Sequence, residues 1–354
     1  MSKIWIKNGN IWDGERFFFS NIYIESGKIK EISKRINPTA DFVYDAKGKI
    51  VSAGFIDSHL HRRNISNNLL GIDVWACYPF GVTCAVEAWA EQYNQEAIEA
   101  NGVKSLVFLG TVIKDGHLCT ELTDLLLPKY GESAIGVKVC FDTTSSDAKD
   151  ITPIQEAVAY AEKHGLKVMV HCNHSPVPMM EIVKTLRKGD VLTHIYHGGE
   201  NNASEDGFEC LKYAREKGVV LDVGVAGHIH TDFGIYREAV QKGQLPDLIG
   251  SDLTLYSAFK RGGRYGLTSC MNIAKECGQD EESIFKCVTS TPAKVFGKEQ
   301  EWGYIKEGRT ADIAVIAYED DLFDLTDASG NRVAWQKGYR CKLTIANGEV
   351  VFRD

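Results

Sequence analysis

Two histidines one residue apart stand in the stretch of this sequence that is most suggestive of chemistry. GFIDSHLHRRN begins at Gly54 and places His59 and His61 at the end of a short apolar run. Residues two apart on an extended strand point the same way, so both imidazoles could hold one metal ion. Such a pair is weak by itself, because histidines also serve as hydrogen-bonded core or loop residues.

Four more polar residues occur at the carboxyl ends of short apolar runs. They stand in AIGVKV, VMVH, VLTH and LIGSD, and they are Lys138, His171, His194 and Asp252. Imidazoles and carboxylates suit Zn²⁺, Mn²⁺, Fe²⁺ or similar ions. Each residue also has an ordinary alternative: a hydrogen-bonded strand-end histidine, a cap or turn aspartate, or a strand lysine whose ammonium reaches the surface. The repeated context favours one shared site.

Lys138 needs a separate argument, because an ammonium group repels metal ions and a buried lysine is costly while it is charged. A lysine amine of lowered pKa could react with CO2 to form a carbamate. This anion has two oxygens and could bridge two ions.

The elements around these residues predict a barrel. From Lys49 onward, short apolar runs alternate with helical stretches, which is typical of βαβ units around a parallel sheet. In one predicted helix, Thr152 is the N-cap, Pro153 the first helical residue, Gln155 the capping-box partner and Gly165 the stop. In a (β/α)8 barrel the strand ends surround one site, so residues distant in sequence meet there.

The two ends of the chain differ from its middle. IWIKNGNIWDG and NIYIESGKIKEI near the start, and CKLTIANGEVVFRD at the end, read as short strands with tight turns. We expect residues 1–52 and 304–354 to form one β-sandwich domain beside a barrel of residues 53–303. The predicted fold class is α/β, a distorted (β/α)8 barrel with this small β domain.

Composition excludes several classes of protein. An apolar fraction of 44% and a charged fraction of 25% are those of a globular protein. The net charge of −8 argues against general nucleic-acid binding. We expect no membrane partner and a cytoplasmic location, because no long apolar segment or signal-peptide core is present. The ten cysteines form no CxxC pair, which favours reduced, mostly buried thiols.

Taken together, the motifs of this sequence resemble those of the amidohydrolase superfamily, and the resemblance extends over almost the whole chain. GKIVSAGFIDSHLH is similar to the family's entry into its first barrel strand, and TSTPAKVFG with GYIKEGRTADIAVI to its exit into the β domain. HLH, LLGID at residues 69–73, GVTCAVEA, GVKV, LTH and SDL resemble the branch of deacetylases and dihydroorotases that carries two metal ions.

The resemblance implies a ligand set and a mechanism. His59 and His61 would hold one ion, His171 and His194 the second, and carboxylated Lys138 would bridge them. Asp252 would bind the first ion and act as general base toward a bridging hydroxide. The expected cofactors are two divalent ions, with zinc first and manganese, iron or nickel as alternatives. The implied reaction is hydrolysis of an amide, cyclic amide or ester, and the resemblance also implies a homo-oligomer.

Substrate contacts are predicted at three positions. HLHRR fits the HxHxR of dihydroorotases, in which the arginine helps to bind a substrate carboxylate, so Arg63 is a candidate. His197 and Arg264 are further candidates, with Arg261 beside the latter in FKRGGRYG. The alternatives are surface charges for the arginines and a hydrogen bond within the loop for His197. The expected partner is a small molecule that bears a carboxylate.

Two departures from the family pattern leave questions open. The segment between GVTCAVEAWA and GVKV is compact, and AGHIH places His228 and His230 where we find no counterpart. We interpret both as solvent-facing loop histidines. Two other functions compete with hydrolysis: deamination of a nucleobase-like ring, which Lys138 argues against in its single-metal form, and a binding protein that has lost catalysis.

Overall fold

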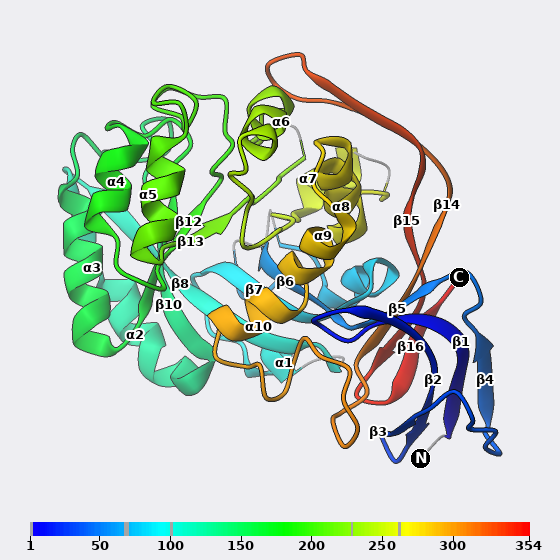
Figure 1. Cartoon of the computed structure of the whole chain (residues 1–354). Helices are drawn as coiled ribbons and strands as arrows, with labels where there is room; N and C mark the ends of the chain where they lie inside the picture. The colour runs from blue at the N-terminus through cyan, green and yellow to red at the C-terminus, as the bar shows by residue number, and fades with distance from the viewer. Residues whose placement is uncertain (1–2, 67–70, 100–101, 228, 261–262) are drawn as a thin grey trace.

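The computed structural model describes residues 3–66, 71–99, 102–227, 229–260 and 263–354. Figure 1 shows a barrel-like body of strands and helices on one side and a sheet that holds both termini on the other. The described strands belong mainly to two sheets, one largely parallel and one mixed. This arrangement confirms the predicted fold class.

The parallel sheet carries the strands whose ends were singled out in the sequence. Its strands run β6, β7, β8, β10, β11, β12 and β13 in space, and all neighbours on this path are parallel. Their bounds are β6 Phe55–Leu60, β7 Val82–Ala90, β8 Lys104–Lys114, β10 Ala134–Cys140, β11 Lys167–His171, β12 Val191–Thr193 and β13 Val220–Asp222. The short strand β9, His117–Cys119, pairs with β8 in antiparallel fashion.

Two isolated bridges close the ring. Leu248 pairs with Asp222 at the end of β13, and Leu253 pairs with Leu60 at the end of β6. The segment from Leu248 to Leu253 therefore takes the place of an eighth strand, although it forms no regular strand of its own. The barrel is distorted at this point, and Asp252 lies in the segment that joins its two edges.

Helices follow most of the barrel strands and cover the outside of the sheet (Figure 1). Their bounds are η1 Val74–Phe80, α1 Gln95–Glu99, α2 Glu121–Tyr130, η3 Gly131–Ser133, α3 Thr152–His164, α4 Met179–Thr185, α5 Glu209–Lys217, α6 Phe233–Gln241, α7 Leu255–Lys260, α8 Leu267–Glu276, α9 Glu281–Cys287 and α10 Ser290–Val295.

Helix α3 shows how closely local sequence signals determine an element. It ends at Gly165, whose φ of 67° is left-handed, as predicted. The predicted N-cap was wrong by one residue: Thr152 is already helical, and the helix has no side-chain cap. Instead, the Asp150 carboxylate accepts a hydrogen bond from the Thr152 amide at 2.9 Å. The aspartate before the helix thus satisfies the Thr152 amide. The amides of Ile154 and Gln155, which a capping Thr152 hydroxyl would have bonded, donate instead to the Ile151 carbonyl oxygen.

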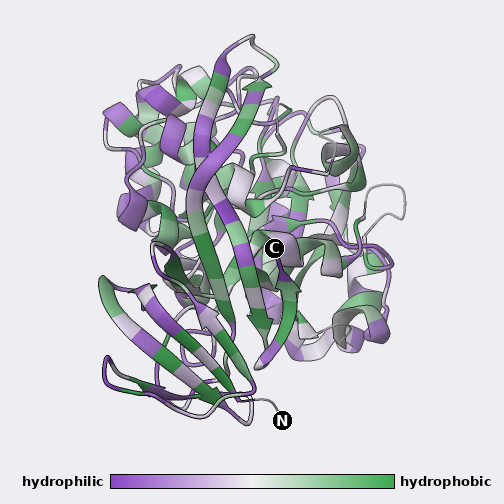
Figure 2. Ribbon diagram, turned by 90° about the vertical axis from the view of Figure 1, so that its right-hand side faces the viewer, coloured by the Kyte–Doolittle hydropathy of each residue, from purple (hydrophilic) through white to green (hydrophobic). Residues whose placement is uncertain are grey.

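The mixed sheet joins the two ends of the chain. Its strands are β1 Ile4–Trp12, β2 Phe17–Glu25, β3 Lys28–Ile32, β4 Phe42–Asp45, β5 Ile50–Ala53, β14 Ile313–Thr326, β15 Arg332–Ala346 and β16 Glu349–Arg353. Strand β5 pairs with β14 in antiparallel register, Ile313 opposite Ala53. Figure 2 shows β14 and β15 as a long twisted pair that extends from this sheet along the barrel.

A single residue separates the mixed sheet from the barrel. Gly54 lies between β5 and β6, and a Cβ atom there would come within 2.1 Å of the Thr83 hydroxyl. Only glycine fits this close approach. The Trp12 indole, which is fully buried, also donates a 3.0 Å hydrogen bond from the mixed sheet to Thr289 beside the barrel. The position of β6, and hence of His59, is therefore fixed from both sheets.

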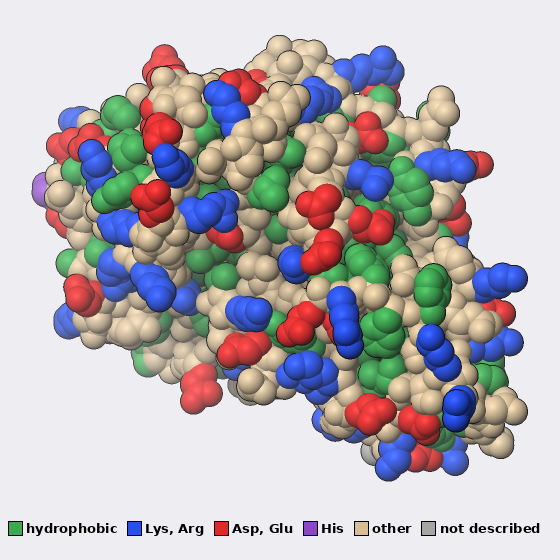
Figure 3. Space-filling model, viewed as in Figure 1, with side chains coloured by type: hydrophobic (Ala, Val, Ile, Leu, Met, Phe, Trp, Pro, Cys, Tyr) green, Lys and Arg blue, Asp and Glu red, His purple; other side chains and the backbone are tan. Residues whose placement is uncertain are grey.

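The structure also bears on the predictions about cysteines, membrane-spanning segments and surface charge that were drawn from composition. All ten cysteines are free thiols and eight of them are buried, as expected. Among the helices of the described segments, none combines the length and the apolarity needed to cross a membrane. On the face drawn in Figure 3, acidic and basic side chains are interspersed.

Candidate metal centre and its cavity

A cavity of about 430 Å³ opens at the carboxyl ends of the barrel strands. Its lining includes all six residues that the sequence proposed as metal ligands: His59, His61, Lys138, His171, His194 and Asp252. They come from β6, β10, β11 and the segments directly after β6 and β12, together with the segment that closes the ring. The structure therefore brings together residues that lie almost 200 positions apart in the chain.

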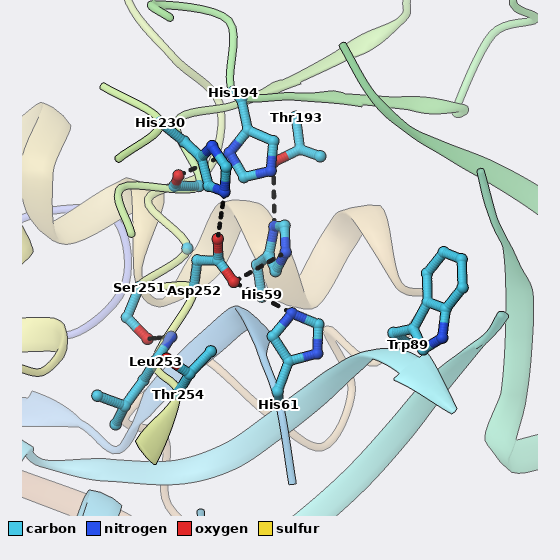
Figure 4. A network of polar contacts seen from close by, with 12 residues as sticks. His59, His61, Trp89, Thr193, His194, His230, Ser251, Asp252, Leu253 and Thr254 are labelled. Carbon is cyan, nitrogen blue, oxygen red and sulfur yellow. Dashed lines mark hydrogen bonds and ion pairs between the residues drawn. The ribbon is translucent and has the colours of Figure 1, made fainter. Parts of the chain in front are cut away.

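The first group consists of His59, His61 and Asp252. Asp252 Oδ1 lies 3.1 Å from His61 Nε2 and 3.6 Å from His59 Nε2. Figure 4 shows these three side chains pointing toward one another. His59 is almost completely buried, and Asp252 is 6% exposed. Both imidazoles thus direct the same nitrogen, Nε2, toward one carboxylate oxygen.

Buried acidic groups hold the other nitrogens of this pair. His59 Nδ1 lies 3.1 Å from Asp222 Oδ2 and 3.0 Å from the Thr193 hydroxyl, which itself donates to Asp222 at 2.7 Å. His61 Nδ1 lies 3.3 Å from Glu87 Oε1. An acceptor at Nδ1 keeps the proton there and leaves the Nε2 lone pair directed into the cavity, as metal-binding histidines require.

The second group consists of His171 and His194. Their ring centroids are 4.4 Å apart. His171 Nε2 lies 3.3 Å from Asp142 Oδ2, and His194 Nδ1 lies 2.7 Å from the Gly224 carbonyl oxygen. His171 therefore presents Nδ1 to the cavity and His194 presents Nε2. His194 Nε2 is buried and has no hydrogen-bond partner in the described structure.

Lys138 lies between the two groups. Its Nζ atom is 3.4 Å from His59 Nε2, and the residue is 3% exposed. Burial lowers the pKa of this amine to about 8, although Asp252 and Asp222 oppose the shift. The neutral amine, which is the form that can react with CO2, is therefore more abundant near physiological pH than in an exposed lysine.

The charges of the first group favour a cation. Burial alone would raise the pKa of Asp252, but His59 and His61 hold it well below its usual range, so the carboxylate stays ionised. Burial alone would lower the pKa of His61, but the hydrogen bonds to Asp252 and Glu87 raise it to about 9. The position between these carboxylates therefore favours a positive charge, whether a proton or a metal ion.

The donor set fits divalent ions. His59, His194 and Asp252 offer ligand atoms that lie within 4.8 Å of one another, and so do His171, His194 and His230. His194, whose buried Nε2 has no hydrogen-bond partner among the described residues, belongs to both sets. Neutral imidazoles with one carboxylate match zinc and similar first-row ions. The residues present therefore fit the metal that the sequence predicted, without distinguishing which ion binds.

Two candidate ligands have unusual backbone conformations. His194 has a φ of 66° and Asp252 a φ of 48°, in the left-handed region that non-glycine residues avoid. His194 directly follows β12, and Asp252 lies near the end of the segment that replaces the eighth strand; both side chains line the cavity. Strain of this kind persists only where the surrounding structure compels it and is concentrated at functional sites.

The three predicted substrate-contacting residues do not line this cavity. Arg63 has a 58% exposed side chain and pairs with Asp73 at 3.5 Å. Arg264 pairs with Asp321 at 2.5 Å and lies in a separate cavity beside β14. His197 is fully buried, and its Nδ1 accepts a hydrogen bond from the Gly199 amide, in line with the alternative of a loop hydrogen bond. Burial lowers the pKa of His197 to about 3.

The other arginines and histidines considered in the sequence analysis do not all lie where they were expected. Arg62 is buried, and its guanidinium group donates to Ser105 and the Ala97 carbonyl oxygen, so it is not a surface charge. His228 and Arg261 lie outside the described residues.

The favoured interpretation of His230 as solvent-facing was wrong. His230 lines the cavity, its side chain is 20% exposed, and Nε2 lies 3.8 Å from Asp252 Oδ2.

Sequence analysis also missed the acidic residues that orient the imidazoles: Asp222, Glu87 and Asp142. Asp222 ends the apolar run VVLD, Glu87 interrupts the apolar strand VTCAVEAWA, and Asp142 follows VCF. An acidic residue inside or directly after a buried strand needs a partner. This was the signal available in the sequence.

Comparisons with known proteins relate the whole chain to metal-dependent hydrolases and deaminases by sequence or fold. Residues 133–351 match the sequence profile of the amidohydrolase family. A deacetylase from Enterococcus faecalis is 28% identical, with 98% of each chain covered. A 5-methylthioadenosine/S-adenosylhomocysteine deaminase from Thermococcus onnurineus is 50% identical, with 99% of this chain and 94% of the relative covered. The crystal structure of a dihydroorotase is similar in fold, with a TM-score of 0.86 at 21% identity and 99% of each chain covered.

Proposed function

Because the chain belongs to the amidohydrolase family, we propose that it is a hydrolase that uses two divalent metal ions to cleave an amide, cyclic amide or ester of a small molecule. The observation that carries this proposal is the position of Lys138. A buried amine 3.4 Å from a candidate ligand would oppose metal binding as an ammonium, but would support it as a carbamate between the two histidine groups.

Each residue then has a distinct task. His59, His61 and Asp252 would hold one ion, His171 and His194 the other, and carboxylated Lys138 both. Zinc is our first choice, with manganese, iron and nickel as alternatives. When bound, such ions would polarise the substrate carbonyl and lower the pKa of a water molecule. Asp252, held ionised by His59 and His61, would accept a proton from the attacking water and pass it to the leaving nitrogen or oxygen.

The walls of the cavity suggest what the substrate carries. Trp89, Ile229 and Tyr256 supply aromatic or apolar surface, and Glu91 adds a carboxylate whose only described side-chain partner is the Trp89 indole, at 3.2 Å. Among the described lining residues no arginine faces these groups. We therefore propose a substrate with an apolar or aromatic part. The expected substrate carboxylate has no support at the Glu91 side, where it would be repelled.

The test is a hydrolysis screen of the metal-loaded protein and its D252N variant. The panel contains N-acetyl amino acids, O-acetylated aromatic hydroxy acids with their amides, hydantoin and dihydroorotate. We expect turnover in one class and a loss on the order of 10³-fold or more in D252N, since both a base and a ligand are removed. D324N, an exposed aspartate on β14, is the matched control. Equal activity of D252N and wild type would refute the mechanism.

Deamination of an adenine compound is the second candidate function. The relative from Thermococcus onnurineus favours it, as does the cluster of His59, His194 and Asp252, which could hold a single ion without help from Lys138. Release of ammonia from 5′-methylthioadenosine or adenine by a protein that contains one ion per chain would select this function. Two ions per chain and a carbamate on Lys138 would select the first.

A further inference from the structure

His230 differs from the other four histidines of the site in the partner behind its ring. His59, His61, His171 and His194 each face a carboxylate or a carbonyl oxygen with the nitrogen that points away from the cavity. Such acceptors fix the proton on the far nitrogen and leave a lone pair for a metal ion. These four rings are therefore prepared as ligands.

The far nitrogen of His230 faces a donor instead. Asn173 Nδ2 lies 3.3 Å from His230 Nδ1, and Asn173 is 6% exposed. With the amide in this orientation its NH2 group donates, so Nδ1 accepts and carries no proton. The proton of the neutral ring is then on Nε2, the atom that faces the cavity. This arrangement disfavours a metal bond at Nε2 and presents an N–H group there.

The surroundings of Nε2 place this N–H group beside the reacting atoms. Nε2 lies 3.8 Å from Asp252 Oδ2, the oxygen of the proposed base that faces away from His61 (Figure 4). The His230 ring centroid is 4.5 Å from that of His194 and 4.9 Å from that of His171. His230 thus lines the cavity beside the second ligand group, and its side chain is 20% exposed.

We propose that His230 is a catalytic residue, an inference that rests on the proposed function. Its Nε2 donates a hydrogen bond to the substrate carbonyl oxygen as negative charge develops on that oxygen. No proton is transferred: the ring stays neutral, and Asn173 keeps the donor on the correct side. The site therefore has four histidine ligands and a fifth histidine that stabilises the oxyanion.

The experiment compares wild type with H230A, H230Q and N173D in the metal-loaded protein. The first readout is metal content and chelator competition, and the second is the affinity for methylphosphonate, a probe with anionic oxygens. We expect H230A to keep both ions and to bind methylphosphonate roughly tenfold more weakly, with kcat lower by on the order of 10²-fold and KM little changed. H230Q, whose amide can donate, should recover part of both losses.

N173D is the variant that tests the tautomer. A carboxylate accepts where the amide donated, so the proton should move to Nδ1 and Nε2 should become a lone pair. We expect N173D to bind methylphosphonate as weakly as H230A while its metal content stays complete. H174Q is the matched control, because His174 is exposed and does not line the cavity.

Two results would overturn the assignment. Loss of an ion from H230A would make His230 a ligand, and unchanged phosphonate affinity in both H230A and N173D would leave it without a role in charge stabilisation. Thermal unfolding of each variant shows whether it is folded. If the wild-type protein hydrolyses nothing in the panel, the proposed function fails, but the phosphonate measurement still decides the role of His230.

Discussion

The floor and the mouth of the cavity are built in different ways. The floor consists of the six candidate ligands, His59, His61, Lys138, His171, His194 and Asp252. The mouth consists of Trp89, Glu91, Ile229 and Tyr256. Each floor imidazole has a partner behind it, and the floor side chains are buried or nearly so. At the mouth, Ile229 is 42% exposed and Tyr256 44% exposed.

This difference separates two requirements of catalysis. Metal ligands must be held to within a fraction of an ångström, so their second nitrogens are fixed by buried acceptors. Surfaces that select a substrate need only shape and charge, and loops can supply these. Changes to the floor should therefore remove activity for every substrate, whereas changes to the mouth should alter the preference among substrates.

The largest expected effect is at Lys138. K138A removes the proposed bridge between the two ligand groups, so we expect loss of at least one ion and a decrease in turnover on the order of 10³-fold or more. Metal analysis and the hydrolysis screen measure both. Carbon-13 NMR in labelled bicarbonate should show a carbamate in wild type only. K167A, at the opposite end of the neighbouring strand, is the control. A fully active, metal-replete K138A would contradict the proposed bridge.

An intermediate effect is expected behind the floor. D222N removes the charge behind His59, and D142N removes it behind His171. We expect each to weaken metal binding by roughly 10- to 100-fold at its own group, as for other partners of metal-binding histidines. Chelator competition followed in two phases would show which ion is released first. If both variants weakened the binding of the same ion, the division of the ligands into two groups would be incorrect.

The smallest effect is expected at the mouth. E91Q removes a negative charge from the wall, so kcat/KM for an anionic substrate should rise roughly fivefold, on the order of 1 kcal/mol. The neutral amide of the same substrate should be unaffected, and metal content should be unchanged. E96Q, an exposed glutamate on α1 outside the cavity, should change neither value. An equal change for the anionic substrate and its neutral amide would mean that Glu91 affects catalysis in general, as a floor residue does. It would contradict the assignment of Glu91 to substrate selection.

The floor was predictable from sequence because its residues share a position relative to their strands. His59, His171 and His194 each end or follow an apolar run, and a barrel gathers such ends in one place. The eighth strand was less visible, since the segment from Leu248 to Leu253 forms only isolated bridges. Its Asp252 was recognisable by the apolar residues before it, and not by a regular strand.

The roles of Arg264 and His230 were not predictable, because both depend on contacts with distant segments. Arg264 follows Asp252 closely in sequence, yet Asp321 of the β14–β15 pair binds its guanidinium group. His230 was interpreted as a loop residue because no periodic pattern surrounds it. Its position depends on Asn173, which comes from the loop after another strand. Local sequence carries no record of such pairings.

The pairing of β5 with β14 has a consequence for synthesis of the protein. β5 leads through Gly54 directly into β6, which carries His59, but its antiparallel partner follows the entire barrel in the chain. On the ribosome, β1 can pair with one edge of β5 early, but the edge that faces β14 remains open while every barrel strand is made. Such long-range pairing is slow to form, so the strand that leads into the candidate metal centre gains its second partner only when the last part of the chain emerges.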